Sequence, residues 1–156
     1  MIWKLLMVLG ILGVDQVVKY WCVNFVQFMS PQPEIAGFFR ITYVENRGIA
    51  FGMFQGSQWI VGVLTVLAVL LICWVLWKKL ISRPMGVWSL VAVLGGALGN
   101  LIDRLLRGFV VDMFEPLFVR FAVFNVADAF LVCGGIVFAV YLVFFYGKEE
   151  KHAAKS

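Results

Sequence analysis

Four long apolar segments, separated by polar connections, dominate the pattern of the chain. We expect membrane-spanning helices at about residues 5–23, 59–77, 84–103 and 126–146, because each segment approaches the roughly 20 apolar residues that a spanning helix needs. Asp15 and Lys19 interrupt only the first segment, which continues to Val23. No small-x-small cleavage site follows, so we interpret this segment as a retained helix and not as a cleaved signal peptide. The pattern predicts an all-α membrane protein with one domain over residues 1–156.

The connection between the first two predicted helices contains a short alternating stretch. From Phe38 to Val44, apolar and polar residues alternate loosely, which favours a β-strand. Gly48 and Gly52 then interrupt an apolar run. We therefore expect a small strand-and-turn unit between the first two helices, lying on the outer membrane surface.

The composition supports a membrane protein. Hydrophobic residues make up 63% of the 156 residues and charged residues 14%, compared with about 25% charged in soluble domains, which excludes a soluble globular protein. The three cysteines fall in separate apolar segments without CxxC spacing, so we interpret them as packing residues. The chain has neither an HExxH motif nor a pair of histidines. We expect no metal ion and no cofactor.

Basic residues cluster near the ends of the predicted helices. The clusters are Lys4, then Lys78, Lys79 and Arg83, and finally Lys148, Lys151 and Lys155. Lys and Arg close to spanning segments are retained on the cytoplasmic side. Both termini and the connection between the second and third helices are therefore expected in the cytoplasm, while residues 24–58 and 104–125 are expected outside. The net charge of +4 thus reflects topology and gives no support to nucleic-acid binding.

Several polar residues lie at or near the outer ends of these predicted helices, where an ionisable group costs at least a few kcal/mol. They are Asp15, Lys19, Asn100, Asp103, Arg104, Arg107, Asp112, Asn125 and Asp128. A residue of this kind marks either a functional site or a tightly paired structural one. Because all of them reach the same side in the predicted topology, we expect one polar cluster at the outer leaflet.

The members of this cluster differ in the partners that the sequence offers them. Asp15 and Lys19 are four residues apart and share a helix face, so a purely structural pairing remains open for them. The same alternative holds for Asp103, which is followed by arginines at positions 104 and 107. Asp112 and Asp128 have no basic residue at helical spacing, and an unpaired carboxylate at the membrane edge favours a functional role.

Carboxylates offer the most complete chemistry in this cluster. A nucleophilic serine needs a neighbouring base, but the only histidine, His152, lies in the predicted cytoplasmic tail, and Lys19 forms no recognisable motif with Ser30 or Ser57. Two neighbouring aspartates share a proton because they cannot both ionise cheaply. One then activates a water molecule while the other protonates the carbonyl oxygen or the leaving amine.

Taken together, five motifs resemble the signature boxes of the bacterial lipoprotein signal peptidases, also called signal peptidase II. The motifs are DQVVK from Asp15, NRGIAF from Asn46, GGALGNLIDR from Gly95, VVD ending at Asp112 and FNVAD from Phe124. The resemblance runs in order over nearly the whole chain. It implies a four-span aspartyl endopeptidase of the inner membrane that removes signal peptides from diacylglyceryl-modified prolipoproteins, cutting before the lipidated cysteine.

The resemblance also implies roles for individual residues. Asp112 and Asp128 would form the catalytic pair. The supporting residues would be Asn100, Asp103, Arg104 and Asn125, which orient the pair, and Asp15, Lys19, Asn46 and Gly48, which shape the pocket and place the substrate. Arg47 and Met113 depart from the usual family pattern, which concerns the grip on the substrate and leaves the pair intact. The implied partners are prolipoproteins and membrane lipids, and we expect a monomer.

Two other classes of function remain as alternatives, because clustered polar residues at membrane depth also build proton-coupled carriers or structural membrane subunits. Against a carrier, the inner halves of the predicted helices contain no ionisable residue that would continue a proton path.

If the protein is the peptidase, its lipidated substrate requires an opening to lipid between helices. We expect residues 38–54 to cover the site, with Phe51, Met53 and Phe54 against lipid or substrate and Asn46 directed at the substrate backbone.

Overall fold

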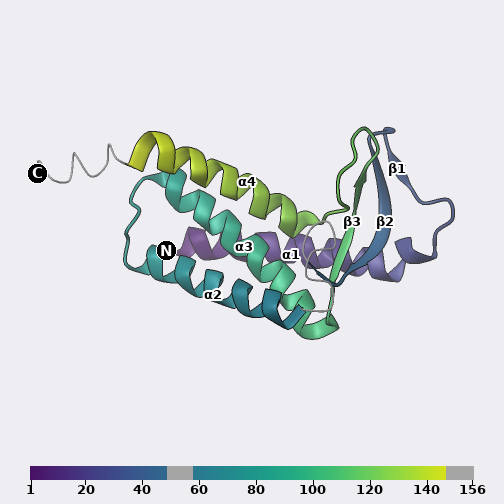
Figure 1. Cartoon of the computed structure of the whole chain (residues 1–156), viewed down its shortest axis with the longest axis horizontal. Helices are drawn as coiled ribbons and strands as arrows, with labels where there is room; N and C mark the ends of the chain where they lie inside the picture. Colours follow the sequence, from purple (N-terminus) through teal and green to yellow (C-terminus); the bar gives the residue numbers. More distant parts are fainter. Residues whose placement is uncertain (49–57, 147–156) are drawn as a thin grey trace, which may run out of the picture.

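The computed structural model describes residues 1–48 and 58–146 (Figure 1). Its helices are α1 (Ile2–Asn24), α2 (Gln58–Trp77), α3 (Pro84–Arg107) and α4 (Val126–Tyr141), with a short 3-10 helix η1 (Val26–Phe28) after α1 and a π-helical turn η3 (Leu142–Tyr146) after α4. By length and composition, four of these helical segments can cross a membrane, which confirms the predicted fold class. Phe51, Met53, Phe54 and the basic residues of the tail lie outside the described residues.

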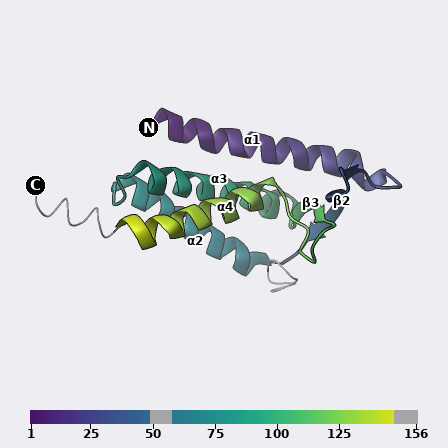
Figure 2. The same ribbon diagram turned by 90° about the horizontal axis from the view of Figure 1, so that it is seen from above.

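Helix α3 forms the centre of the bundle, and α1, α2 and α4 all pack against it (Figures 1 and 2). In the most apolar stretch of each helix, 72% of the α3 residues are buried, compared with 6% in α2 and 11% in α4. The outer faces of α2 and α4 are thus apolar and uncovered by protein, as expected of helices that face lipid.

Small residues allow α3 to approach its neighbours closely. A Cβ atom on Gly96 would lie 2.4 Å from the backbone oxygen of Ala127 in α4, and one on Gly99 would lie 2.7 Å from Oδ2 of Asp15 in α1. Glycines at helix contacts are a common device in membrane proteins, where close packing replaces the hydrophobic effect between helices. These two positions bring α1, α3 and α4 together where the polar residues are located.

A three-stranded antiparallel sheet lies across one end of the bundle (Figure 1). Its strands are β1 (Glu34–Ile35), β2 (Phe39–Asn46) and β3 (Val110–Pro116), in the order β1-β2-β3. The expected strand near residues 38–44 corresponds to β2. The expected unit between the first two helices lacked one strand of the sheet, β3. Strand β3 comes from the second outer segment and pairs with β2 so that Val44 lies opposite Asp112 and Asn46 opposite Val110.

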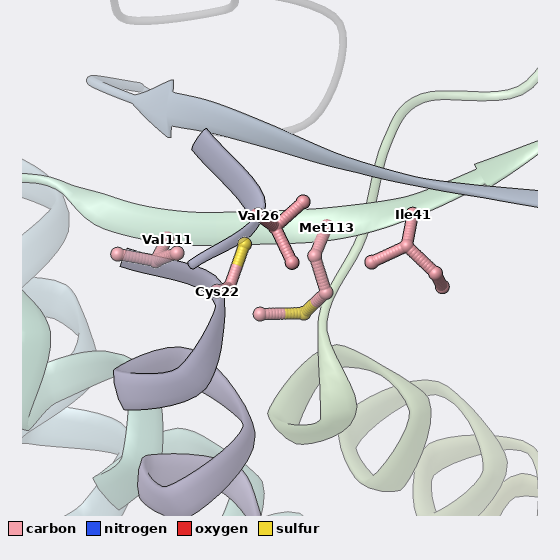
Figure 3. Close-up of a cluster of buried hydrophobic side chains, with 5 residues drawn as sticks. All are labelled: Cys22, Val26, Ile41, Val111 and Met113. Carbon is pink, nitrogen blue, oxygen red and sulfur yellow. The ribbon is translucent and has the colours of Figure 1, made fainter. Parts of the chain in front are cut away.

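A small hydrophobic core joins this sheet to the end of α1 (Figure 3). Its buried members are Cys22, Val26, Ile41, Val111 and Met113. Because successive side chains of a strand point to opposite faces, the burial of Val111 and Met113 in this core directs Asp112 to the other face of β3. Met113 therefore belongs to the core, on the face of β3 opposite Asp112.

The turn from α3 into β3 is short because Gly108 caps α3 directly after Arg107. Gly108 has φ +75° and its backbone N–H donates to the carbonyl oxygen of Arg104. A left-handed residue at this position is readily supplied by glycine, which has no Cβ atom. Strand β3 can therefore begin at Val110, close to the polar end of α3.

Candidate active site

Asp112 lies on β3 with both carboxylate oxygens bonded to asparagine amides. Asn46, at the end of β2, donates from Nδ2 to Asp112 Oδ2 at 2.8 Å, and Asn125 donates from Nδ2 to Asp112 Oδ1 at 2.7 Å. The side chain of Asp112 is buried. We expected Asn46 to face the substrate backbone, but the structure directs its amide nitrogen at Asp112, and its Oδ1 accepts the N–H of Gly48.

Asp128 occupies the first turn of α4 and forms a capping box with Asn125. Asn125 Oδ1 accepts the backbone N–H of Asp128 at 2.9 Å, and Asp128 Oδ2 accepts the backbone N–H of Asn125 at 3.2 Å. This reciprocal arrangement satisfies two N–H groups at the start of the helix and holds Asp128 in place. Its other oxygen, Oδ1, accepts a hydrogen bond of 2.6 Å from Nδ2 of Asn100 in α3.

The two aspartates belong to one hydrogen-bonded group. Asn125 Nδ2, which donates to Asp112, also lies 3.1 Å from Asn100 Oδ1, and Asn100 donates to Asp128. Two amides thus connect the two carboxylates, although the carboxylates come from β3 and α4. The predicted meeting of Asp112, Asp128, Asn100 and Asn125 in one cluster agrees with these contacts.

The acid-base behaviour of Asp112 is set by its burial. Burial raises the pKa of this carboxyl to about 7, and the negative charge of Asp128 acts in the same direction. The hydrogen bonds from Asn46 and Asn125 and the positive charge of Lys19 oppose the shift only in part. A carboxyl with a pKa near neutrality can both hold and release a proton at physiological pH, as acid-base catalysis requires.

A buried ionic network is joined to the two aspartates through Asn100. Lys19 Nζ is 2.9 Å from Asp15 Oδ2 and 3.0 Å from Asp103 Oδ2, and all three side chains are fully buried. Asp103 also pairs with Arg107, one turn further along α3. Asp15 Oδ1 accepts the backbone N–H of Ala127, which fixes the start of α4 against α1. Asp15 and Lys19 therefore contact protein groups, and the role that the resemblance implies for them, shaping the pocket and placing the substrate, stays a prediction.

Arg104 does not pair with Asp103, the residue before it in the sequence. Its guanidinium donates to the backbone oxygens of Gly48, at 3.3 Å, and Asn100, at 3.4 Å. Of the two arginines considered for Asp103, the structure pairs only Arg107 with it. Arg104 instead ties the residues after β2 to α3, and so holds Asn46 close to the two aspartates.

A groove of about 760 Å³ lies beside this cluster, between α2 and α3. Its apolar walls include Trp59, Val63 and Leu67 from α2 and Leu101 and Leu105 from α3, while Arg47 and Arg104 line it as well. Arg47, the second departure from the family pattern, is paired with Glu45 at 2.9 Å and lies over the ring of Phe109. The groove combines an apolar channel with positive charge.

Most of the chain matches known proteins. The family model described as signal peptidase (SPase) II matches residues 7–144. A lipoprotein signal peptidase of Clostridioides difficile is 39% identical over 146 residues, covering 94% of this chain and 98% of the relative. One from Streptococcus pneumoniae is 38% identical and covers 92% of this chain and 91% of the relative. The chain belongs to the signal peptidase II family.

Solved structures agree with this family assignment. A bacterial membrane enzyme determined by the in meso method at 2.3 Å resolution is 28% identical, with a TM-score of 0.83, and the match covers 90% of this chain and 87% of that one. A second such structure, at 1.9 Å resolution, has a TM-score of 0.81 at 28% identity, covering 91% and 93%. The predicted class, an aspartic endopeptidase of the signal peptidase II type in the inner membrane, is confirmed, and neither alternative is favoured.

Sequence reasoning missed one polar residue of this signal peptidase II. The Nε2 of Gln16 lies within 3.3 Å of Asp15 Oδ2, the backbone oxygen of Gly99 and Asp103 Oδ1, so this side chain links α1 to α3. Only its place in the DQVVK motif could have indicated it, because glutamine at a helix surface is otherwise unremarkable. A second missed contact is the backbone N–H of Val111, which donates to Asp103 and anchors β3 beside Asp112.

Proposed function

We propose that Asp112 and Asp128 are the catalytic pair with which this signal peptidase II hydrolyses diacylglyceryl-modified prolipoproteins before their lipidated cysteine. The observation that supports this assignment best is the hydrogen-bonded group in which Asn100 and Asn125 connect the two carboxylates. The pKa of Asp112, raised to about 7 by burial, fits the same role. The family supplies the reaction, and the geometry supports these two residues as its acid and base.

The reaction follows from two carboxyl groups that share one proton. The ionised carboxylate accepts a proton from a water molecule as the water oxygen attacks the carbonyl carbon, and the protonated carboxyl gives its proton to the carbonyl oxygen. In the second step the carbon–nitrogen bond breaks, and the leaving amine takes a proton from the pair. The asparagine N–H groups stabilise whichever carboxylate is ionised at each stage.

The groove between α2 and α3 suits the lipid part of the substrate. The acyl chains of a diacylglyceryl group must remain in an apolar environment while the peptide bond reaches the aspartates. The walls formed by Val63, Leu67 and Leu105 provide such an environment, and Arg104 connects the groove to the polar cluster. We place the acyl chains in this groove, as the expected opening to lipid requires.

The charge distribution and the architecture of the enzyme support an orientation with the catalytic pair outside. The sheet and the start of α4, which carry Asp112 and Asp128, lie at one end of the bundle, and the connection between α2 and α3 lies at the other, with the N-terminus also at that end (Figure 1). Lys78, Lys79 and Arg83 in that connection favour the cytoplasmic side. The catalytic pair would then act at the outer leaflet, with both termini inside. One chain contains all the proposed catalytic residues, so a monomer suffices.

Replacement of either aspartate by asparagine tests the assignment. Asp112→Asn and Asp128→Asn preserve size and most hydrogen bonds but remove the shared proton, so each variant should lower kcat by roughly 10³-fold or more, and the double variant should lose little further activity. The assay is cleavage of a lipidated peptide by detergent-purified protein in the presence of a metal chelator. Glu115→Gln, the same chemical change at a surface residue of β3, serves as the control. Near wild-type activity of Asp112→Asn would refute the assignment.

A further inference from the structure

The ammonium group of Lys19 has three oxygen neighbours, which match its three N–H donors. Two are the carboxylate oxygens of Asp15 and Asp103. The third is the amide oxygen of Asn100, at 3.0 Å. Lys19 is fully buried and Asn100 nearly so, with 5% of its surface exposed, so water does not compete for these contacts. The lysine is thus a fixed donor pointed at one end of the Asn100 side chain.

This contact determines which way the Asn100 amide faces. An asparagine amide has an acceptor end and a donor end of nearly equal shape, so its orientation depends on its partners. Lys19 has no acceptor, and it therefore requires the Oδ1 end. The Nδ2 end is left to face Asp128, and it donates to Oδ1 at 2.6 Å. The reversed amide would place N–H groups against the ammonium and a carbonyl against the carboxylate.

The same orientation extends to the second asparagine. Asn100 Oδ1 also accepts from Nδ2 of Asn125, at 3.1 Å, and the Asn125 Nδ2 group donates to Asp112 Oδ1. The opposite end of Asn125 accepts the backbone N–H of Asp128. Lys19 and Asn125 therefore both donate to the oxygen of Asn100. The amide nitrogens of Asn100 and Asn125 donate to Asp128 and Asp112, so each aspartate receives an N–H.

We propose that Lys19 is a positioning residue for the reaction, which fixes the orientation of the Asn100 amide and through it the side-chain N–H donors that Asn100 and Asn125 present to the catalytic pair. This inference rests on the proposed role of Asp112 and Asp128. It gives a specific form to the expectation that Lys19 supports the site. Two carboxylates and two cations balance within the network, because Asp15 and Asp103 are matched by Lys19 and Arg107. Lys19 differs from Arg107 in that it also donates a hydrogen bond to Oδ1 of Asn100.

The test is Lys19→Met, which keeps the apolar stem of the side chain and removes its donors. Asn100 then loses the charged donor that holds its oxygen end, and its N–H is aimed less firmly at Asp128, so kcat should fall roughly 10- to 100-fold, the range expected for one hydrogen bond to a charged group. KM should stay within about twofold, because the Lys19 side chain is fully buried. The profile of kcat/KM against pH should move to higher pH, because carboxylates that lose a donor and the nearby positive charge of Lys19 bind protons more tightly.

Arg107→Met is the matched control. It removes the other cationic partner of Asp103 but has no recorded contact with either asparagine within the described residues. The charged groups around the pair that remain in this control are Lys19, Arg104, Asp15 and Asp103. Arg107→Met should lower thermal stability while kcat per folded molecule and the pH profile stay near wild type. A purely structural role for Lys19 would make the two variants behave alike.

A second variant keeps the test decisive if Lys19→Met fails to accumulate. In Lys19→Met combined with Asp15→Asn, no unpaired carboxylate remains at position 15, and the new amide oxygen can still accept the N–H of Ala127. The same loss of kcat is expected. Wild-type kcat and pH profile in either folded variant would overturn the role of Lys19. Failure of the catalytic assignment is distinguishable, because it would show as activity in Asp112→Asn.

Discussion

At the scale of single residues, the alternation of side chains along β3 determines where Asp112 lies. Its neighbours Val111 and Met113 are fully buried on the core face of β3 (Figure 3). Asp112 is thereby held on the opposite face, out of bulk water, beside Asn46 and Asn125. The same burial that protects the site from solvent raises the pKa of Asp112 to about 7.

This raised pKa predicts a pH-dependent effect of Asp112→Asn on stability. A carboxyl whose pKa is higher in the folded state than its unfolded value, about 4, favours folding when protonated. That contribution is complete below the unfolded value and is lost as the pH rises through about 7. The variant lacks this titration, so its melting temperature relative to wild type should rise between pH 5 and pH 8. Tryptophan fluorescence in detergent measures the two melting temperatures. The difference between variant and wild type at pH 5 is the internal control. A difference that stays constant between pH 5 and pH 8 would contradict the raised pKa.

The residues of the site were largely accessible from sequence, but their contacts were not. Unpaired carboxylates at positions 112 and 128 stand out because membrane depth makes them costly. The partner of Asn46 depends on the pairing of β2 with β3, which are separated by more than 60 residues in the sequence, and local pattern contains no information about it. Gln16 was missed for the same reason, since its partners Gly99 and Asp103 belong to another helix.

At the scale of elements, the site depends on the close approach of α3 and α4. Gly96 makes this approach possible directly beside Ala127, the residue before Asp128. The hydrogen bond from Asn100 to Asp128 crosses the same interface. Strand β3 was not predicted because Val110 to Phe114 is apolar on both sides of Asp112, with no alternation to distinguish a strand from the end of a helix. Its pairing with β2 depends on tertiary contacts.

Gly96→Ala tests this dependence. The added methyl group would meet the Ala127 backbone oxygen at 2.4 Å, which no rotamer change can relieve, so α4 must move away from α3. We expect a lower melting temperature and at least a tenfold loss of kcat as the Asn100–Asp128 contact lengthens. Gly135→Ala in α4 is the control, because its Cβ meets nothing within 4 Å, and alanine there should stabilise the helix by up to about 1 kcal/mol. Equal behaviour of the two variants would exclude a packing effect.

At the scale of the whole molecule, the two ends of the bundle differ in how their positive charges are compensated. At the sheet end, Arg40, Arg47, Arg107 and Lys19 have carboxylate partners, while Arg104 and Arg120 have no ion pair among the described residues. Within the described residues, no ion pair is recorded for Lys4, Lys78, Lys79 or Arg83 at the other end. Lys78 and Arg83 instead lie over the rings of Trp77 and Phe145. Cationic side chains beside aromatic rings are typical of a membrane interface, and uncompensated Lys and Arg favour the cytoplasmic one.

This asymmetry predicts the result of labelling single cysteines in intact cells. In a background with Cys73→Ala and Cys133→Ala, Cys22 is buried and should not react. Arg120→Cys, in the connection after β3, should react with a membrane-impermeant maleimide from outside, because the proposed topology puts this connection on that side. Lys78→Cys should react only after the membrane is permeabilised. Both positions are exposed and each change removes one positive charge, so the pair is matched. The reverse pattern would place Asp112 and Asp128 on the cytoplasmic side and would contradict the proposed access of substrate.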